Sequence, residues 1–248
     1  MKDIPAWTGP FAPDALPSEL LTAERPFVVR GGFAHWPVVQ AARQSDVALA
    51  RYLMSLYNGV RVALFELAPE ARGRVFYADE TLSTFNFKRH AATLDQVLTG
   101  LIGVAQNPEP PALYVGSTTV EAVLPGFLQA NAVGLGERDA LVSLWLGNRT
   151  RIAAHYDLPD NFAIVAAGRR RFTVFPPEQI HNLYMGPLDP TPAGQPVSLV
   201  DFEQPDLQRF PRFSQAWEAG EQVVLEPGDA LFIPSMWFHH CLLYTSDA

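Results

Sequence analysis

The stretch Ile152-Ala153-Ala154-His155-Tyr156-Asp157 has the pattern of a β-strand that ends in polar, metal-binding side chains. Successive side chains of a strand point to opposite faces, so His155 and Asp157, two residues apart, are expected on the same face. An imidazole and a carboxylate are two of the three protein ligands in the 2-His-1-carboxylate arrangement, which holds non-haem Fe(II) and leaves coordination positions open. We therefore expect a metal site here that needs a second, distant histidine.

A suitable histidine follows a turn and a strand near the end of the sequence. Pro227-Gly228-Asp229 is typical of a turn and Ala230 to Ile233 of a buried strand, after which come His239 and His240. His239 lies 82 residues after Asp157 (239 − 157 = 82), too far for a local zinc knuckle but natural for opposite strands of a barrel. Neighbours in a regular strand face opposite ways, so only one of the two histidines can be a ligand of the same ion.

Length, composition and charge restrict the class of protein. The chain has 248 residues, 48% hydrophobic and 18% charged, which fits one sizeable globular domain. Its formal net charge of −8 disfavours a nucleic-acid partner, because binding a phosphate backbone requires clustered positive charge. The single cysteine, Cys241, excludes an intrachain disulfide framework and is compatible with a reducing compartment.

The sequence gives no sign of a membrane protein. Residues 1–17 contain four prolines and no apolar core of a signal peptide, and no apolar run is long enough to cross a bilayer. We therefore expect a cytoplasmic protein without a membrane partner.

The two halves of the chain differ in their patterns. The first half predicts strands at 25–30 and 60–67 and amphipathic helices from about residue 46 and at 94–101. The second half predicts short strands at the positions 113–115, 141–146, 161–167, 170–175, 222–225 and 230–233. The strand at 141–146 is apolar nearly throughout and is expected to be buried on both faces.

Many short strands separated by turns indicate an all-β barrel or sandwich with a helical N-terminal portion. Asn107-Pro108-Glu109-Pro110-Pro111 is the best candidate linker. We therefore expect an N-terminal α+β segment, 1–106, packed on a barrel, 107–248.

Several ordered motifs in the second half resemble one known family. These motifs are His155-Tyr156-Asp157, Gly168 to Phe172, Phe175 to Gln179, and Glu226 to Asp229 continuing to His239. Together they resemble the cupin-like JmjC oxygenases, and within them the asparaginyl hydroxylase that acts on hypoxia-inducible factor. The resemblance implies a mainly β double-stranded β-helix, that is, a cupin or jelly-roll barrel.

The resemblance also implies an activity and a set of site residues. The activity is that of an Fe(II)- and 2-oxoglutarate-dependent dioxygenase, a hydroxylase of a C–H bond in a protein or small-molecule substrate. The ligand of the family directly follows a bulky aromatic residue and lies five residues after the proline, which selects His239 to join His155 and Asp157. His240 is then expected to have a packing or supporting role.

Three further residues match positions that contact the co-substrate in the resembled hydroxylase. Arg170 stands where the family often has lysine, and it is expected to bind the far carboxylate of 2-oxoglutarate. Tyr114 can share that carboxylate, and Asn161 also matches a co-substrate position. Ile152 replaces a threonine of the hydroxylase, so one hydroxyl contact is lost.

The end of the sequence departs from the resembled family. Members continue after the distal histidine with a closing strand, usually followed by helices that often build a dimer. Cys241 to Ala248 does not resemble that continuation, so we expect the closing strand to be missing or altered after His240. The resemblance implies a possible homodimer in the full-length parent. Two alternatives stay open: a metal-binding cupin whose reaction does not use 2-oxoglutarate, and a non-catalytic cupin binding module.

Overall fold

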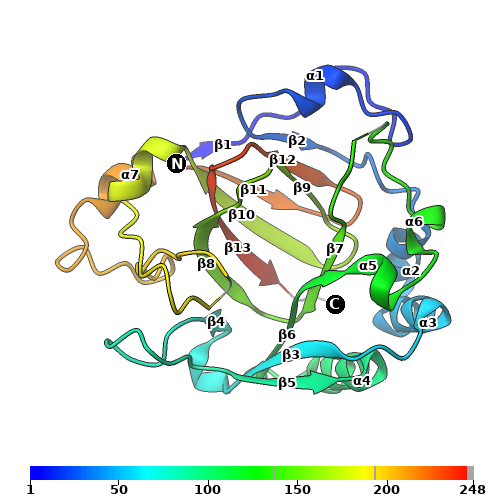
Figure 1. Ribbon diagram of the computed structural model, residues 1–248, viewed down its shortest axis with the longest axis horizontal. Coiled ribbons are helices and arrows are strands. Elements are labelled where there is room, and N and C mark those ends of the chain that lie inside the picture. Colours follow the sequence, from blue (N-terminus) through cyan, green and yellow to red (C-terminus); the bar gives the residue numbers. More distant parts are fainter. Residues whose placement is uncertain (137, 193, 245–248) are drawn as a thin grey trace.

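The fold is described from a computed structural model of the 248-residue chain, which covers residues 1–136, 138–192 and 194–244, Tyr244 by its backbone alone. Three β-sheets surround the centre of the molecule, and most of the helices lie on one side of them (Figure 1). This arrangement confirms the predicted fold class, a mainly β jelly-roll type of cupin fold. Its sheets are not closed into one continuous barrel.

The largest sheet carries the strands that matter most for the site. It has six strands in the spatial order β1-β11-β10-β13-β8-β4. Their bounds are Lys2–Asp3 for β1, Glu221–Leu225 for β11, Arg169–Phe175 for β10, Phe238–Tyr244 for β13, Arg151–Tyr156 for β8 and Arg74–Val75 for β4. Strand β13 is therefore central, between β10 and β8, and it continues four residues beyond His240. The remaining tail, residues 245–248, lies outside the described residues.

Two smaller sheets complete the β-structure. One has the order β2-β12-β9, with bounds Phe27–Val29, Ala230–Ile233 and Asn161–Ile164. The other has the order β5-β3-β6-β7, with bounds Lys88–Ala92, Val62–Leu67, Ala112–Thr119 and Ser143–Gly147. Among the described residues, the strands at the ends of these two sheets, β2, β9, β5 and β7, each pair with only one other strand.

The helices begin where the sequence supplies helix-start signals. Pro37 occupies the first turn of α2, the Ser45 side chain accepts a hydrogen bond from the amide of Ala48 at the start of α3, and Thr93 with Gln96 forms a capping box at α4. The bounds of the α-helices are Ser18–Leu21 for α1, Pro37–Gln44 for α2, Asp46–Leu56 for α3, Leu94–Val104 for α4, Val120–Val123 for α5, Phe127–Ala130 for α6 and Phe213–Ala219 for α7. Two 3₁₀ turns lie at Pro69–Ala71 (η1) and Pro177–His181 (η2).

The largest hydrophobic core joins elements from both halves of the chain. Leu98 of α4, Val115 of β6 and Phe232 of β12 belong to one cluster of buried side chains. The two halves of the chain therefore share one core, and the first half also supplies strands to all three sheets. The proposed boundary at residues 106 and 107 stays a prediction.

One predicted strand differs from its expected form. Strand β7 begins at Ser143, two residues later than predicted, and it is not buried on both faces: Trp145 is 42% exposed and the preceding Leu141 is 79% exposed. An apolar run cannot by itself distinguish a central strand from an edge strand, and β7 lies at the end of its sheet. The expectation of burial on both faces was therefore wrong.

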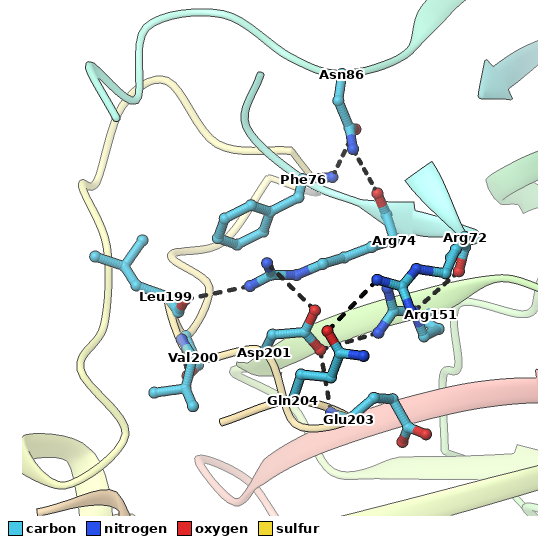
Figure 2. Close-up of polar contacts among 11 residues, drawn as sticks. Arg72, Arg74, Phe76, Asn86, Arg151, Leu199, Val200, Asp201, Glu203 and Gln204 are labelled. Carbon is cyan, nitrogen blue, oxygen red and sulfur yellow. Dashed lines mark hydrogen bonds and ion pairs between the residues drawn. The ribbon is translucent and has the colours of Figure 1, made fainter. Parts of the chain in front are cut away.

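The long loop between β10 and α7 is attached to β8 and β4 by a network of charged side chains (Figure 2). The carboxylate of Asp201 accepts a hydrogen bond from the guanidinium of Arg151 at 2.9 Å and forms an ion pair with Arg74 at 3.7 Å. The guanidinium of Arg74 lies 3.6 Å from the centre of the Phe76 ring and donates to the carbonyl of Leu199. Because these groups come from three segments, the network fixes the loop against the outer face of the strand that carries His155.

None of the helices in the described part of the chain is both long and apolar enough to pass through a membrane.

Candidate metal centre

Strands β8 and β13 place the two predicted histidine ligands side by side. The strands are antiparallel, and His155 lies directly opposite His239, so both rings project from the same face. The ring centroids are 4.4 Å apart. Asp157 follows the last residue of β8, and one potential ligand atom from each of His155, Asp157 and His239 lies within 4.8 Å of the others. The three residues predicted from the sequence thus meet at one point.

A β-bulge in β8 sets which side chains share that face. The register with β13 shifts between His239 and Cys241, so that Cys241 lies opposite Ile152. In a regular strand Ile152 and His155, three residues apart, would face opposite ways, whereas the extra residue of a bulge brings both to the inner face. The bulge is supported from outside, because the amide of Ser198 donates a 2.7 Å hydrogen bond to the carbonyl of Ala154.

Backbone carbonyls orient both imidazole rings. The Nδ1 atom of His155 lies 2.9 Å from the carbonyl of Ala153, and Nδ1 of His239 lies 3.3 Å from the carbonyl of Trp237. A carbonyl only accepts hydrogen bonds, so each Nδ1 carries the proton and each Nε2 keeps its lone pair. Histidine ligands of metals are commonly fixed in this way.

Asp157 is held by its backbone and by its side chain. Its carbonyl accepts a 3.0 Å hydrogen bond from the amide of Met236, and its Oδ2 accepts one of 2.9 Å from the side chain of Asn161. The same Oδ2 lies 3.5 Å from Nε2 of His239. The carboxylate is therefore fixed beside the two imidazoles even though it lies beyond the end of the strand.

A second set of contacts joins the loops that flank the three residues. The amide of Ser235 donates to Oδ1 of Asp160 at 2.8 Å, and its hydroxyl donates to the carbonyl of Leu158 at 2.5 Å. Sequence reasoning did not single out Ser235 or Asp160, since neither belongs to a motif and they are 75 residues apart.

The electrostatics of the site favour a neutral His239. Burial lowers the pKa of this imidazole, and the neighbouring His155 lowers it further, while Asp157 and the hydrogen bond to the Trp237 carbonyl raise it. A neutral imidazole is the form that binds a metal. Two imidazole nitrogens and one carboxylate oxygen, all on one side of an ion, fit a divalent transition metal with open coordination positions.

The inner face continues from the three residues to Arg170. On β10, Val174 lies opposite His239, Phe172 opposite Cys241 and Arg170 opposite Leu243, so these three β10 side chains share the face of His239. Arg170 lies four residues along the strand from Val174, about 13 Å at a rise of about 3.3 Å per residue. Arg170 therefore lies on the same face as His239, and its role in binding a co-substrate stays a prediction.

Tyr114 belongs to the same deep region. Burial raises the pKa of its phenol, and the positive charge of Arg170 acts in the opposite direction. Arg170 itself lies 4.0 Å from Sγ of Cys241 and donates to the carbonyl of Trp145 at 3.3 Å. An arginine and a buried phenol therefore lie near each other, and these two groups can bind a carboxylate.

Other predicted residues take different positions. Asn161 contacts the carboxylate of Asp157, a contact that its co-substrate assignment did not include. His240 faces away from the centre, and its ring stacks on Phe202 with 4.7 Å between centroids. Burial lowers the pKa of His240 to about 3, with the nearby Arg171 and Arg151 adding to this effect.

Comparison with known proteins agrees with this geometry. The family described as "Cupin-like domain" matches residues 13–242. Among curated proteins, the chain is 38% identical over 88 residues to tRNA wybutosine-synthesizing protein 5 of Gallus gallus, covering 36% of this chain and 25% of that protein.

Two relatives carry demethylase names. The identity is 30% over 116 residues to Lysine-specific demethylase JMJ31 of Arabidopsis thaliana, covering 46% of this chain and 20% of that protein. The chain is also 34% identical over 105 residues to Lysine-specific demethylase 8 of Xenopus tropicalis, covering 42% of this chain and 23% of that protein. The chain thus matches about a quarter or less of the length of these relatives.

The family match spans nearly the whole chain, and the relatives include JmjC proteins. The chain belongs to the cupin-like domain family, with JmjC-type relatives.

Proposed function

We propose that the protein is an Fe(II)- and 2-oxoglutarate-dependent dioxygenase that hydroxylates a C–H bond of a protein or small-molecule substrate. The observation that supports this most strongly is the convergence of His155, Asp157 and His239, whose candidate ligand atoms lie within 4.8 Å of one another. A cation, Arg170, shares their inner face. This donor set is the one that non-haem iron oxygenases use.

The protein residues would bind and orient the reacting groups. His155, Asp157 and His239 would hold iron, while Asn161 and the carbonyls of Ala153 and Trp237 keep those three side chains in place. Iron and 2-oxoglutarate, when bound, supply the oxidising chemistry.

Arg170 and Tyr114 would bind the co-substrate. Arg170 would donate to the distal carboxylate of 2-oxoglutarate, and the hydroxyl of Tyr114 would donate to the same group. The side chains of Phe172 and Val174 lie on the inner face between Arg170 and the histidines, and both are buried. These apolar walls would keep the middle of the site dry.

The identity of the substrate is a separate question. The relatives' names refer to tRNA in one case and to lysine in the others, so the family by itself does not select a substrate class. We favour a protein or small molecule over tRNA because the net charge of −8 opposes a polyanion. We favour the cytoplasm because the one cysteine suits a reducing compartment.

The test is conversion of 2-oxoglutarate to succinate, measured by NMR with Fe(II), ascorbate and air. We expect uncoupled turnover by the wild-type chain and none by Asp157→Ala. Arg170→Ala should raise the KM for 2-oxoglutarate by about 10- to 100-fold, the equivalent of losing one charge-assisted hydrogen-bonded pair.

Arg169→Ala is the matched control, because Arg169 is adjacent but on the opposite face, paired with Glu226 at 2.8 Å. The KM of Arg169→Ala for 2-oxoglutarate should stay at the wild-type value. Iron binding without succinate formation would favour the cupin whose reaction does not use 2-oxoglutarate. Neither iron binding nor turnover would favour the non-catalytic binding module.

A further inference from the structure

Strand β5 forms an open edge of its sheet. It is the first strand in the order β5-β3-β6-β7, and in the described part of the chain it pairs with β3 alone. Residues 88–91 are exposed. Figure 1 shows β5 along the lower border of the molecule with no strand beyond it. Alternate amide and carbonyl groups of β5 therefore point away from β3 and are available to another strand.

Two arginines flank a small-residue floor on one face of this edge. Ala63 lies opposite Ala91, and Phe65 lies opposite Arg89, so these four side chains share a face. The guanidinium of Arg89 lies 5.5 Å from the centre of the Phe65 ring. Arg61 is two residues before Ala63, at the other end of the alanine pair. The floor between the two arginines is thus made of methyl groups.

A groove occupies this place. It has a volume of about 360 Å³ and is lined by Arg61, Val62, Ala63, Arg89, His90 and Ala91. A larger residue at Ala91 would fill it. Because the side chain there is a methyl group, a side chain opposite Ala91 on an added strand could lie over Ala63 and reach Arg61.

The charges at this edge are not neutralised. Within the described ranges, Arg61, Lys88 and Arg89 form no ion pair shorter than 4.0 Å, whereas seven other arginines do. The nearest carboxylate in register is Glu66, opposite Lys88 and on the other face from the groove. In a chain of net charge −8, the groove is therefore a local positive region.

We propose that the β5 edge binds an extended acidic segment of a partner protein by strand addition. The main chain of the partner pairs with β5. Two of its carboxylates, two residues apart, lie opposite Arg89 and Ala91 and pair with Arg89 and Arg61. The expected partner motif is acid-x-acid within an extended, proline-free stretch. This interaction goes beyond the proposed oxygenase activity and does not depend on it.

The same observations disfavour other occupants. A second copy of this edge would bring like charges together, which is how charged edge strands prevent self-association. Nucleic acid has no main-chain amides to match those of β5, and two arginines are few for a phosphate backbone in an acidic protein. Charge and backbone geometry together select an acidic polypeptide.

The test uses the full 248-residue chain and a fluorescein-labelled nine-residue peptide with two glutamates two residues apart among valines and threonines. Fluorescence anisotropy should show binding. A peptide with both glutamates replaced by glutamine should bind at least about ten-fold more weakly, a loss of about 1.4 kcal/mol.

Backbone pairing is tested separately from charge. Two further peptides carry N-methyl groups on alternate residues, one on the odd and one on the even positions. Only the set whose amides face β5 should lose binding. Equal binding by both N-methylated peptides would overturn strand addition.

The protein side is tested with the double variant R61E/R89E, which should abolish peptide binding while its thermal unfolding stays at the wild-type temperature. Arg51→Glu, an exposed reversal on α3, is the control and should bind normally. Absence of peptide binding by the wild-type chain, or binding of a 12-nucleotide polyuridine in its place that R61E/R89E abolishes, would overturn the proposal.

Discussion

Replacing Asp201 by asparagine should destabilise the protein by about 2–3 kcal/mol, although Asp201 lies in a loop. Its carboxylate lies 2.9 Å from the guanidinium of Arg151 and 3.7 Å from that of Arg74. The side chains are mostly buried, with 25% exposure for Asp201, 13% for Arg151 and 20% for Arg74. Asparagine keeps the shape and one acceptor but leaves two neighbouring cations without a counter-charge.

The magnitude follows from the number of contacts and their burial. A hydrogen bond to a charged group contributes about 1.5–3 kcal/mol, and breaking a buried ion pair from one side costs about 3–5 kcal/mol. Residual exposure and the retained amide oxygen reduce this to about 2–3 kcal/mol. For a chain of this size the melting temperature should fall by about 4–12 °C, measured by circular dichroism.

Glu80→Gln provides the matched control. Glu80 pairs with Arg209 at 3.0 Å, a similar distance, but the two side chains are 85% and 55% exposed. Its loss should cost less than about 0.5 kcal/mol. The reasoning is refuted if Asp201→Asn melts within about 1 °C of the wild type, or if the two variants are equally destabilised.

Three further changes test other parts of the structure. Ser235→Ala removes the hydroxyl that bonds to Leu158, so iron affinity, measured by anaerobic calorimetry, should fall several-fold, and an unchanged affinity would contradict a supporting role. Gly73→Ala should lower the free energy of unfolding by more than about 3 kcal/mol, measured in urea, because a Cβ would lie 1.8 Å from the carbonyl oxygen of Arg149. Gly31 has a similar positive φ but open space around it, so Gly31→Ala should lower the free energy of unfolding by only about 1 kcal/mol. The carboxylate of Glu121 accepts hydrogen bonds from the amides of Leu128 and Gly126, and these bonds lower the pKa of its carboxyl in the folded state. The charged carboxylate therefore stabilises the fold above the pKa of the unfolded state, and this stabilisation is lost as the pH falls through the lower pKa of the folded state. The destabilisation of Glu121→Gln relative to the wild type should therefore be larger at pH 7 than at pH 3. A difference in melting temperature that is equal at both pH values would contradict this sign.

The parts of the site that sequence reasoning could predict depend on local rules. Alternation along a strand put His155 and Asp157 on one face, and the turn at Pro227-Gly228-Asp229 placed a strand before His239. The structure brings all three together.

The parts that could not be predicted depend on contacts between distant residues. Asp157 lies beyond its strand and is fixed by the amide of Met236, 79 residues later (236 − 157 = 79). The bulge that turns Ile152 inward becomes visible only through its register with β13. Asp201 and Arg151 are likewise 50 residues apart, and no local pattern links a loop carboxylate to a strand. The prediction that β7 is buried on both faces was wrong for the same reason, because the position of a strand within a sheet is a property of the whole fold.

The central proposal is that His155, Asp157 and His239 bind one iron ion and that Arg170, on the same face, binds 2-oxoglutarate. Anaerobic titration of the wild-type chain with Fe(II) should show one equivalent bound, and addition of 2-oxoglutarate should produce a weak visible charge-transfer band. His155→Ala should lose both, and Arg170→Ala should keep the iron while requiring more 2-oxoglutarate for the band. An unchanged band in His155→Ala, or no iron bound by the wild type, would contradict the account.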